Sequence, residues 1–395
     1  MSKQKQGFLV KAAVLAIIVL QYTPAITTPA LGAIAQAFPN VNLELVKQIS
    51  ALPNLLAIPL ALSVGWLTRF MSKKILLNIA MVLLFIGGIV PAIFGDMNFI
   101  LSMRAVFGLG FGIIFPLSVI LIADLFEGKE RDTLMGYQGS VGAAAGIVFQ
   151  MIGGYLAGMY WRDAFLGFLI TIPAILLILW KLPEPEKLPE TVNSDNAAKP
   201  KLTSGAWQIT IGTMIVQIFI FSFMTNMAIV MMSNNIGTPA QVGMLFTIFT
   251  IGAFVSGLIF GKILGIFKRN TIAFACGVMS VGLFMALNSD DLNLYYVIAL
   301  IYGFGFGTFN PQLFLSIADS VHPSASALAI SVMLAFCMFG QFLSPIALAY
   351  ISNIVGLVGP KAGWMIAAPC LLAACLLLVV RNAVTKPKGL ASANS

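Results

Sequence analysis

Charged residues are scarce in this chain of 395 residues: Asp, Glu, Lys and Arg make up 9% of it, whereas hydrophobic residues make up 59%. Soluble domains carry about 25% charged residues, so the composition excludes an ordinary soluble protein. Mean hydropathy is +0.97. Long apolar runs fill almost the whole length, whereas a membrane β-barrel would show short alternating strands. We therefore expect a polytopic helical membrane protein, because a lipid-exposed backbone must satisfy its own hydrogen bonds.

Cysteine is scarce as well, and the usual catalytic motifs are absent. The four cysteines (Cys276, Cys337, Cys370 and Cys375) lie inside apolar runs and form no CxxC pair, so neither a disulfide nor a metal site is expected. The chain has no Walker loop, GxSxG, HExxH or zinc-ligand spacing, and no soluble stretch long enough for an ATPase domain. These absences argue against an enzyme, and no cofactor is expected.

A repeat relates the two halves of the chain. The stretch Gly108–Asp124 returns 195 residues later as Gly303–Asp319, with 8 identities in 17 positions. The identities include three glycines, a proline and the closing aspartate, which chance in apolar sequence would hardly align together. We infer that the chain is a duplicated membrane protein.

The apolar runs predict twelve membrane-spanning helices, each of about 20 residues as a hydrocarbon core requires. Their expected ranges are 11–35, 46–68, 75–95, 99–122, 133–158, 164–181, 206–231, 240–263, 271–288, 294–318, 325–352 and 361–381. The one long connection, Leu182–Gly205, is rich in Pro, Asn and charge and is typical of a flexible linker. We expect an N-terminal six-helix bundle over residues 1–181, a linker over 182–205 and a C-terminal six-helix bundle over 206–395.

Lys and Arg are unevenly divided between the two sides of these spans. The alternating segments outside the spans hold 18 on one side and 3 on the other, and Arg104 lies inside a span. The positive-inside rule then predicts that both termini and the linker are cytoplasmic. The net charge of +8 thus indicates membrane topology, and nucleic acid is not an expected partner. The first apolar run is too long for a signal peptide and lacks a small-residue cleavage site, which indicates an uncleaved first span.

Glycines and prolines recur within the spans. Gly108 and Gly112, like Gly303 and Gly307, lie one helical turn apart, where small residues let helix backbones approach closely. Prolines within spans kink their helices. Kinked, glycine-faced helices in two parallel halves suit a transporter whose halves rock, although membrane helices tolerate both residue types in general. With the duplication, the pattern favours a transporter.

Two motifs in the first half resemble those of the major facilitator superfamily. Gly65–Lys74, GWLTRFMSKK, is similar to the family's GxLaDrxGrrxxl loop, with Arg69 where the family has Asp and Ser72 where it has Gly. Arg104–Gly108 resembles the RxxqG motif, with Phe107 in place of Gln. The resemblance covers nearly the whole chain. It implies an all-α membrane protein of twelve transmembrane helices in two pseudo-symmetric six-helix bundles.

A third stretch, Ala145–Gly154, is similar to the antiporter signature gxxxGPxxGG of the same family. The closing pair of glycines is present, but Phe149 and Gln150 replace the Gly-Pro dipeptide. An antiport mechanism therefore stays one of several alternatives.

Arg104 lies about five residues into its span, which is roughly 8 Å deep at about 1.5 Å per residue. A charge at that depth indicates a functional residue. The resemblance implies that it shapes the helix interface and the coupling near the outer gate. The alternative is a shallow arginine whose side chain reaches the outer headgroups.

Asp124 ends the fourth span beside the predicted loop that carries Lys73 and Lys74. In the resembling family, an acid here pairs with basic residues of the loop and latches the inner gate. An ion pair made in one state alone biases the equilibrium between states. The alternative is a plain interfacial acid, since surface pairs contribute little. Asp319 occupies the equivalent place in the second half.

In the resembling family, helices 1, 4, 7 and 10 line a central cavity. That nominates a set of neutral polar, aromatic and methionine side chains for substrate binding: Gln21, Tyr22, Phe111, Phe115, Gln217, Phe221, Met224, Phe306 and Asn310. Three of them, Gln217, Phe221 and Met224, fall at i, i+4 and i+7 on one helical face. Hydrogen-bonding groups amid Phe and Met suit an amphipathic organic molecule. Each polar member has interhelical packing as its alternative role.

The 14 acidic residues all lie in loops or at helix ends, so no carboxylate is available at mid-span. A buried carboxylate is the simplest proton carrier in a coupled transporter. Either coupling uses the interfacial Asp124, or transport is not proton-coupled. The same absence argues against a strongly cationic substrate, whereas Arg104 leaves an anion open.

Three hypotheses follow. The leading one is a secondary active transporter of the drug-efflux kind, which exports small amphipathic compounds by alternating access, with protons as a candidate coupling ion. The second is an uptake carrier or facilitator for a neutral or anionic metabolite. The third, a membrane receptor without transport, is disfavoured because no signalling domain is present. We expect a monomer in the cell (inner or plasma) membrane, with a small-molecule substrate and the lipid bilayer as its partners.

Overall fold

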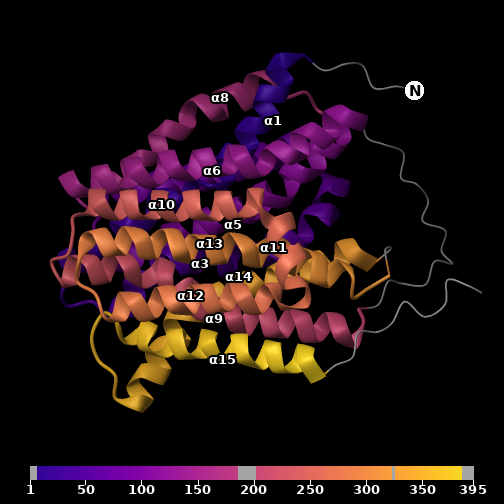
Figure 1. The fold of residues 1–395 in the computed structure, drawn as a ribbon. Coiled ribbons are helices and arrows are strands. Elements are labelled where there is room, and N and C mark those ends of the chain that lie inside the picture. Colours follow the sequence, from indigo (N-terminus) through magenta and orange to yellow (C-terminus); the bar gives the residue numbers. More distant parts are fainter. Residues whose placement is uncertain (1–6, 186–201, 323–324, 385–395) are drawn as a thin grey trace, which may run out of the picture.

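The computed structural model describes residues 7–185, 202–322 and 325–384. Figure 1 shows two helical bundles that overlap in the middle of the view, with α1, α6 and α8 of the N-terminal bundle at the top and α9, α12 and α15 of the C-terminal bundle at the bottom. The N-terminal bundle comprises α1 (Phe8–Gln21), α2 (Leu31–Ala37), α3 (Leu43–Phe70), α4 (Lys73–Ile89), α5 (Met97–Leu125), α6 (Gly128–Met159), α7 (Asp163–Leu166) and α8 (Ile172–Lys181). The C-terminal bundle comprises α9 (Ser204–Ser233), α10 (Pro239–Leu258), α11 (Phe260–Phe267), α12 (Thr271–Leu287), α13 (Leu292–Ala318), α14 (Ser326–Val355) and α15 (Ala362–Val384).

The number of spans agrees with the prediction once a bent helix is counted. Among the described residues, 11 helices are long and apolar enough to cross a membrane, and the pair formed by Phe8–Gln21 and Thr23–Ala37, bent by 48°, makes a twelfth. Pro24 and Pro29 lie at this bend, each at the start of a short 3-10 helix, η1 (Thr23–Ile26) and η2 (Thr28–Ala30). Proline lacks the N–H that an unbroken α-helix needs, which accounts for the break.

The repeated glycines let helices touch backbone to backbone at the same place in each bundle. In the first bundle a Cβ on Gly108 would overlap Pro53 of α3, and one on Gly112 would overlap Ala57. In the second, a Cβ on Gly303 or Gly307 of α13 would overlap the α10 backbone at Phe249 or Ala253. The repeat seen in the sequence is therefore a repeated helix–helix contact, α3 with α5 and α10 with α13.

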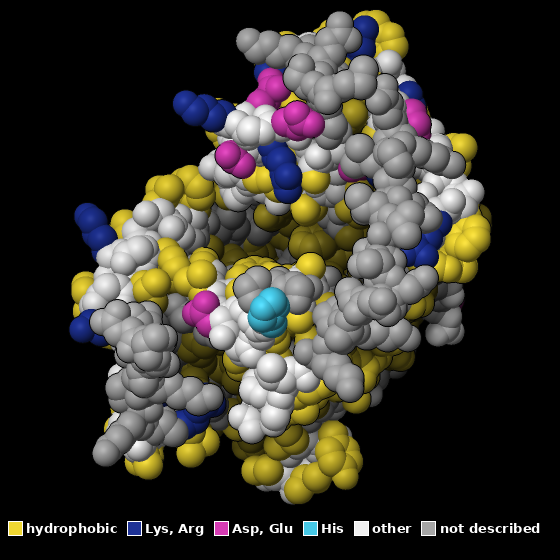
Figure 2. Space-filling view, turned by 90° about the vertical axis from the view of Figure 1, so that its right-hand side faces the viewer, with side chains coloured by type: hydrophobic (Ala, Val, Ile, Leu, Met, Phe, Trp, Pro, Cys, Tyr) yellow, Lys and Arg dark blue, Asp and Glu magenta, His cyan; other side chains and the backbone are white. Residues whose placement is uncertain are grey.

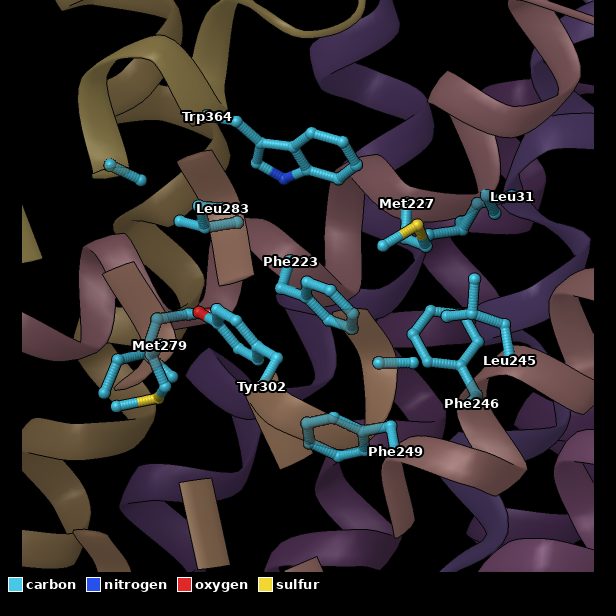
Figure 3. Close-up of a cluster of buried hydrophobic side chains, with 14 of the residues drawn as sticks. Leu31, Phe223, Met227, Leu245, Phe246, Phe249, Met279, Leu283, Tyr302 and Trp364 are labelled. Atoms are coloured by element: carbon cyan, nitrogen blue, oxygen red, sulfur yellow. The ribbon is translucent and has the colours of Figure 1, made fainter. Parts of the chain in front are cut away.

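Three contact zones join the bundles: α2 with α9, α6 with α10, and α3 with α14. A Cβ on Gly32 of α2 would overlap the carbonyl oxygen of Ala228 of α9, and the amide of Gln36 donates to the carbonyl of Met232 over 3.2 Å. At the second zone the backbone of α6 at Gly154 meets that of α10. Apolar side chains fill the space between the bundles there, so that Leu31 of α2 packs in one cluster with residues of α9 and α10 (Figure 3).

The bundles part at the end where α1 begins and α15 ends, which we call the termini side; it lies on the right in Figure 1. Figure 2 looks directly at this side and shows a hollow between the bundles, lined mainly by hydrophobic side chains. The contacts of α2 with α9 lie at the other end of the first span, which we call the opposite side. The molecule is thus closed on the opposite side and open on the termini side.

Of the predicted linker 182–205, residues 186–201 lie outside the described part of the chain. The flanking helices end at Lys181 and begin at Ser204. The division of the chain at 182–205 remains a prediction.

Candidate functional site

Three of the predicted cavity residues meet in one place in the C-terminal bundle. Phe221 and Met224 of α9 and Phe306 of α13 line a pocket of about 60 Å³. The other lining residues are Ile220, Phe249, Tyr302 and Gln341. Of these, Gln341 of α14 is a mid-span amide outside the nominated set. It is the one polar side chain besides the Tyr302 hydroxyl in this pocket wall. At about 60 Å³ the pocket can hold only part of a ligand, to which it presents an apolar surface with one amide.

Stacked aromatic rings support this pocket. The ring of Phe223 lies 4.2 Å from that of Tyr302, centroid to centroid, at an angle of 9°, and Figure 3 shows both rings beside Phe249. The Tyr302 hydroxyl donates to the carbonyl of Ile220 over 2.9 Å. Phe249 in turn lies 5.4 Å from Phe306, again between ring centroids. Because the rings are fixed on one another and on the α9 backbone, Phe306 is presented by a rigid wall.

Gln217 does not join the pocket. It is only 2% exposed, and its side chain lies against Gly340 and Cys337 of α14. Its Oε1 atom has no hydrogen-bond partner among the described residues. Asn310 is half-buried, and its amide donates to the carbonyl of Phe306 on its own helix over 3.1 Å. In this conformation both polar groups serve helix packing, and their role in binding remains a prediction.

The predicted polar residues of the first span also find partners inside their own bundle. Gln21 donates its amide to the hydroxyl of Ser118 on α5, and Ser118 donates to the carbonyl of Phe115 over 2.9 Å. The ring of Tyr22 lies against α6, where a Cβ on Gly142 would overlap it.

Phe111 lies in a similar setting. It stacks on Phe107 with 6.3 Å between the ring centroids, and Phe107 contacts Phe168 edge-on. Tyr22, at 37%, is the most exposed of the nominated aromatic residues.

One hydrogen bond joins the two bundles at mid-span, and it involves a residue of the antiporter-like stretch. Thr250 of α10 donates its hydroxyl to Oε1 of Gln150 of α6 over 3.1 Å. Gln150 is 8% exposed. No sequence pattern predicts that these two polar residues pair, because they lie 100 positions apart in different halves.

Arg104 is fully buried among protein atoms, and its role near the outer gate remains a prediction. Its Nε donates to the carbonyl of Ile49 on α3 over 2.8 Å. The guanidinium carbon lies 4.1 Å from the centroid of the Phe107 ring, a distance suited to a cation–π contact. Arg104 therefore ties α5 to α3 within the N-terminal bundle.

The predicted contact between Asp124 and the basic loop is present for Lys73, whose Nζ lies 2.5 Å from Oδ2 of Asp124. Lys74 contributes its backbone N–H instead. It donates to Glu184 over 3.0 Å, while the N–H of Lys73 donates to the other carboxylate oxygen over 2.9 Å. A carboxylate at a helix N-terminus is favourable for the helix dipole, and Glu184, just after α8, was not among the predicted site residues.

Asp124 and Lys73 both belong to the N-terminal bundle, and their ion pair is present while the termini side is open. The pair itself therefore does not hold the two bundles together. Asp319, its counterpart in the repeat, is exposed and has no ion-pair partner among the described residues. A latching function for either acid remains a prediction.

Comparison with known proteins identifies the family. The profile of the Major Facilitator Superfamily matches residues 13–211 and again residues 209–395. The chain belongs to the major facilitator superfamily. The expected fold, two pseudo-symmetric bundles of six spans, is confirmed, and the protein is a multi-pass membrane transporter, not an enzyme.

Individual relatives are distant. A triacylglyceride transporter of Mycobacteroides abscessus is 25% identical over 169 residues, which are 42% of this chain and 31% of that protein. The multidrug transporter protein MdtP of Bacillus subtilis is 26% identical over 102 residues, 26% of this chain and 19% of that protein. The matches thus span less than a third of the relatives' length. Among solved structures, the nucleoside transporter NupG aligns with a TM-score of 0.77 at 13% identity over 95% of this chain and 99% of its own, which shows a shared fold.

Proposed function

We propose that this transporter exports small amphipathic organic compounds by alternating access. The observation that carries the proposal is the hollow of the termini side, lined mainly by hydrophobic side chains, with the pocket of Phe221, Met224 and Phe306 in the C-terminal bundle. Apolar walls with few polar groups favour a ligand of the same character.

The direction of transport depends on the orientation in the membrane. The excess of Lys and Arg, 18 against 3, is on the termini side, and the positive-inside rule supports a cytoplasmic position for it. The open hollow would then accept compounds from the cytoplasm or from the adjoining leaflet. Release on the other side requires the bundles to separate there, where Gly32 packs on Ala228 and the amide of Gln36 donates to the carbonyl of Met232.

The relatives support the same class of substrate. Two distant relatives are named as a triacylglyceride transporter and a multidrug transporter, and a triacylglyceride is an apolar compound. Protons are a plausible coupling ion for the family. No acidic residue of the described chain lies at mid-span, so coupling through a deep carboxylate is not part of the proposal.

A neutral metabolite is the second candidate substrate, favoured by the amide of Gln341 in the pocket wall. The anionic alternative is weakened, because Arg104, the group nominated for it, is fully buried against Ile49 and Phe107. A metabolite carrier would bind its substrate through several hydrogen bonds, whereas an exporter of amphipathic compounds would depend on apolar contact area.

Transport by the purified protein in proteoliposomes tests the proposal. A panel would include uncharged, singly positive and singly negative amphipathic dyes together with D-xylose and a nucleoside, each measured with and without an imposed pH gradient. We expect movement of the uncharged or weakly charged dyes and none of the sugar or nucleoside. Phe306→Ala should reduce dye transport, while Phe284→Ala, an exposed site of α12 outside the pocket, should not. Transport of the sugar or nucleoside alone would overturn the proposal in favour of the metabolite carrier.

A further inference from the structure

A second and larger cavity lies inside the C-terminal bundle. It has a volume of about 490 Å³ and is bounded by α9, α12, α13 and α15. On α13 it is lined by Phe309, Gln312, Leu313 and Ser316, which follow one another at i, i+3, i+4 and i+7 and so share a helical face. None of its lining residues belongs to the pocket of Phe221, Met224 and Phe306. It is therefore a separate site, away from the space between the two bundles.

The packing of α9 against α15 explains where this cavity begins. Trp364, near the start of α15, donates its indole N–H to the carbonyl of Ser222 over 3.2 Å. The cavity occupies the part of both helices nearer the termini side, residues 208–216 of α9 and 374–382 of α15. Gly212 leaves room there, because a Cβ added to it would meet no atom within 4 Å.

The lining changes character along the cavity. Aliphatic side chains make up most of its wall, among them Val216 of α9, Ala273 of α12 and Ala374 of α15, whereas Arg269 and Arg381 lie at the ends of helices on the termini side. The uncharged polar members of the lining are Gln208, Thr213, Gln312, Ser316 and Asn382. None of the described residues that line it is acidic. The space is thus a mainly apolar slot with two arginines at one end, and its volume of about 490 Å³ lies within the range of about 300–1,000 Å³ that is usual for ligand sites.

The basic end of the slot is held in place by hydrogen bonds. Asn382 donates its amide to the carbonyl of Arg269 over 2.8 Å and to Oδ1 of Asn270 over 2.9 Å. This joins the last turn of α15 to η5 (Lys268–Asn270), the short 3-10 helix that precedes α12. The two arginines are therefore brought together by a fixed backbone, although they are 112 positions apart in the chain.

We propose that this slot binds one anionic phospholipid from the cytoplasmic leaflet, with its phosphate at Arg269 and Arg381 and an acyl chain between α9, α12, α13 and α15. Guanidinium groups bind phosphate through paired, charge-assisted hydrogen bonds. Basic pockets between transmembrane helices on the cytoplasmic side are known places for anionic headgroups. The apolar inner wall accounts for a lipid tail, which a free phosphate ion lacks. The proposal rests on the cytoplasmic orientation of the termini side and does not depend on which compound is transported.

Native mass spectrometry of the detergent-purified protein tests this proposal. Dioleoyl phosphatidylglycerol or dioleoyl phosphatidylcholine is added at equal concentration, and the lipid molecules retained per protein are counted. We expect one phosphatidylglycerol to be retained at concentrations about tenfold below those that phosphatidylcholine needs. Arg269→Gln with Arg381→Gln should abolish this difference. Lys129→Gln with Arg131→Gln removes the same charge from the termini side of the other bundle and should leave the difference intact.

A second variant tests whether lipid retention depends on the space inside the slot, independently of charge and of misfolding. Gly212→Leu fills the apolar part while keeping both arginines, and it should reduce phosphatidylglycerol retention in a protein that still elutes as a single species in size-exclusion chromatography. Equal retention of the two lipids by the parent protein would overturn the proposal. So would unchanged phosphatidylglycerol retention in the double arginine variant, or displacement of the lipid by inorganic phosphate at the same concentration, which would indicate a site for the free anion.

Discussion

The Nε of Arg104 donates a hydrogen bond to the carbonyl of Ile49, to which Pro53 cannot donate one. In an unbroken helix the N–H of residue 53 would bond to that carbonyl, but proline has no N–H. The Nε of Arg104 takes its place over 2.8 Å, and Gly108, one turn further along α5, packs directly on Pro53. Arg104 thus compensates on α5 for a proline on α3.

The second half of the chain lacks both partners. The repeat places Ala299 where the first half has Arg104, and Gly303 packs on Phe249 as Gly108 packs on Pro53. Because α10 has no proline at this contact, none of its carbonyl groups there loses its hydrogen-bond donor, and the second half has no arginine at the equivalent position. The second half thus lacks both the arginine and the proline. This supports the interpretation that the hydrogen bond from Arg104 serves the carbonyl group that Pro53 leaves without a donor.

Substitution of Arg104 should therefore lower the free energy of unfolding by less when Pro53 is replaced as well. Arg104→Leu leaves the Ile49 carbonyl buried without a donor, which costs about 1–3 kcal/mol. In a Pro53→Ala background, the new N–H of residue 53 can bond to that carbonyl, so the cost should fall by about 1 kcal/mol or more. Unfolding of the four proteins in mixed detergent micelles gives the coupling free energy.

Pro59 provides the matched control for this cycle. It also interrupts α3, but the carbonyl that it frees belongs to Leu55, with which Arg104 forms no hydrogen bond. Arg104→Leu and Pro59→Ala should be additive. If the effects of Arg104→Leu and Pro53→Ala on the free energy of unfolding were also additive, the proposed compensation of Pro53 by Arg104 would be contradicted.

The two aspartates of the repeat should respond differently to the same substitution. Asp124→Asn removes the ion pair with Lys73 and should shift the equilibrium between the open and closed forms of the termini side, whereas Asp319→Asn removes an exposed acid without a described ion-pair partner. Distances between spin labels on the termini-side ends of α6 and α14 report this equilibrium. Identical distance distributions for the parent and Asp124→Asn, with transport intact, would refute a role for the pair in gating.

Much of this architecture could be predicted from the sequence, because its causes are local. Apolar length predicts the spans, and the glycine repeat predicts the contact that Gly108 and Gly303 make in their bundles. The pairing of Asp124 with Lys73 followed from the motif and the alternation of sides.

The orientation of polar residues within a span could not be predicted in the same way. By its spacing, Gln217 shares a helical face with Phe221, yet it packs against α14. The rotation of α9 about its axis and the size of the neighbouring side chains decide which residues of that face line the pocket. Gln150 with Thr250 and Arg269 with Arg381 are brought together only by tertiary packing. Their sequence separation leaves no periodic signal.

The close contact of Gly32 with Ala228 should control the seal on the opposite side. A larger side chain at Gly32 would overlap the α9 backbone, so Gly32→Val should weaken the closed arrangement and favour opening there. A cysteine at Leu31, which is fully buried next to this contact, would then react faster with a membrane-impermeant maleimide, by about tenfold if the closed form loses about 1.4 kcal/mol. Gly158→Val is the control, because a Cβ at Gly158 has no neighbour within 4 Å. An unchanged rate in Gly32→Val would show that this contact does not limit opening.

Phe221 and Gln217 should separate binding from stability, although they lie one turn apart on α9. Phe221 lines the pocket, and loss of its ring should weaken binding of a transported amphipathic dye by about 1.5 kcal/mol, or about tenfold. Gln217 is buried against α14, so Gln217→Ala should lower the unfolding temperature and change dye affinity by less than about twofold, well under 1.4 kcal/mol. Dye binding by fluorescence anisotropy and thermal unfolding would be measured on both variants, with Gln4→Ala as a control near the N-terminus. A tenfold loss of affinity in Gln217→Ala with unchanged unfolding would mean that α9 rotates during transport and presents Gln217 to the substrate.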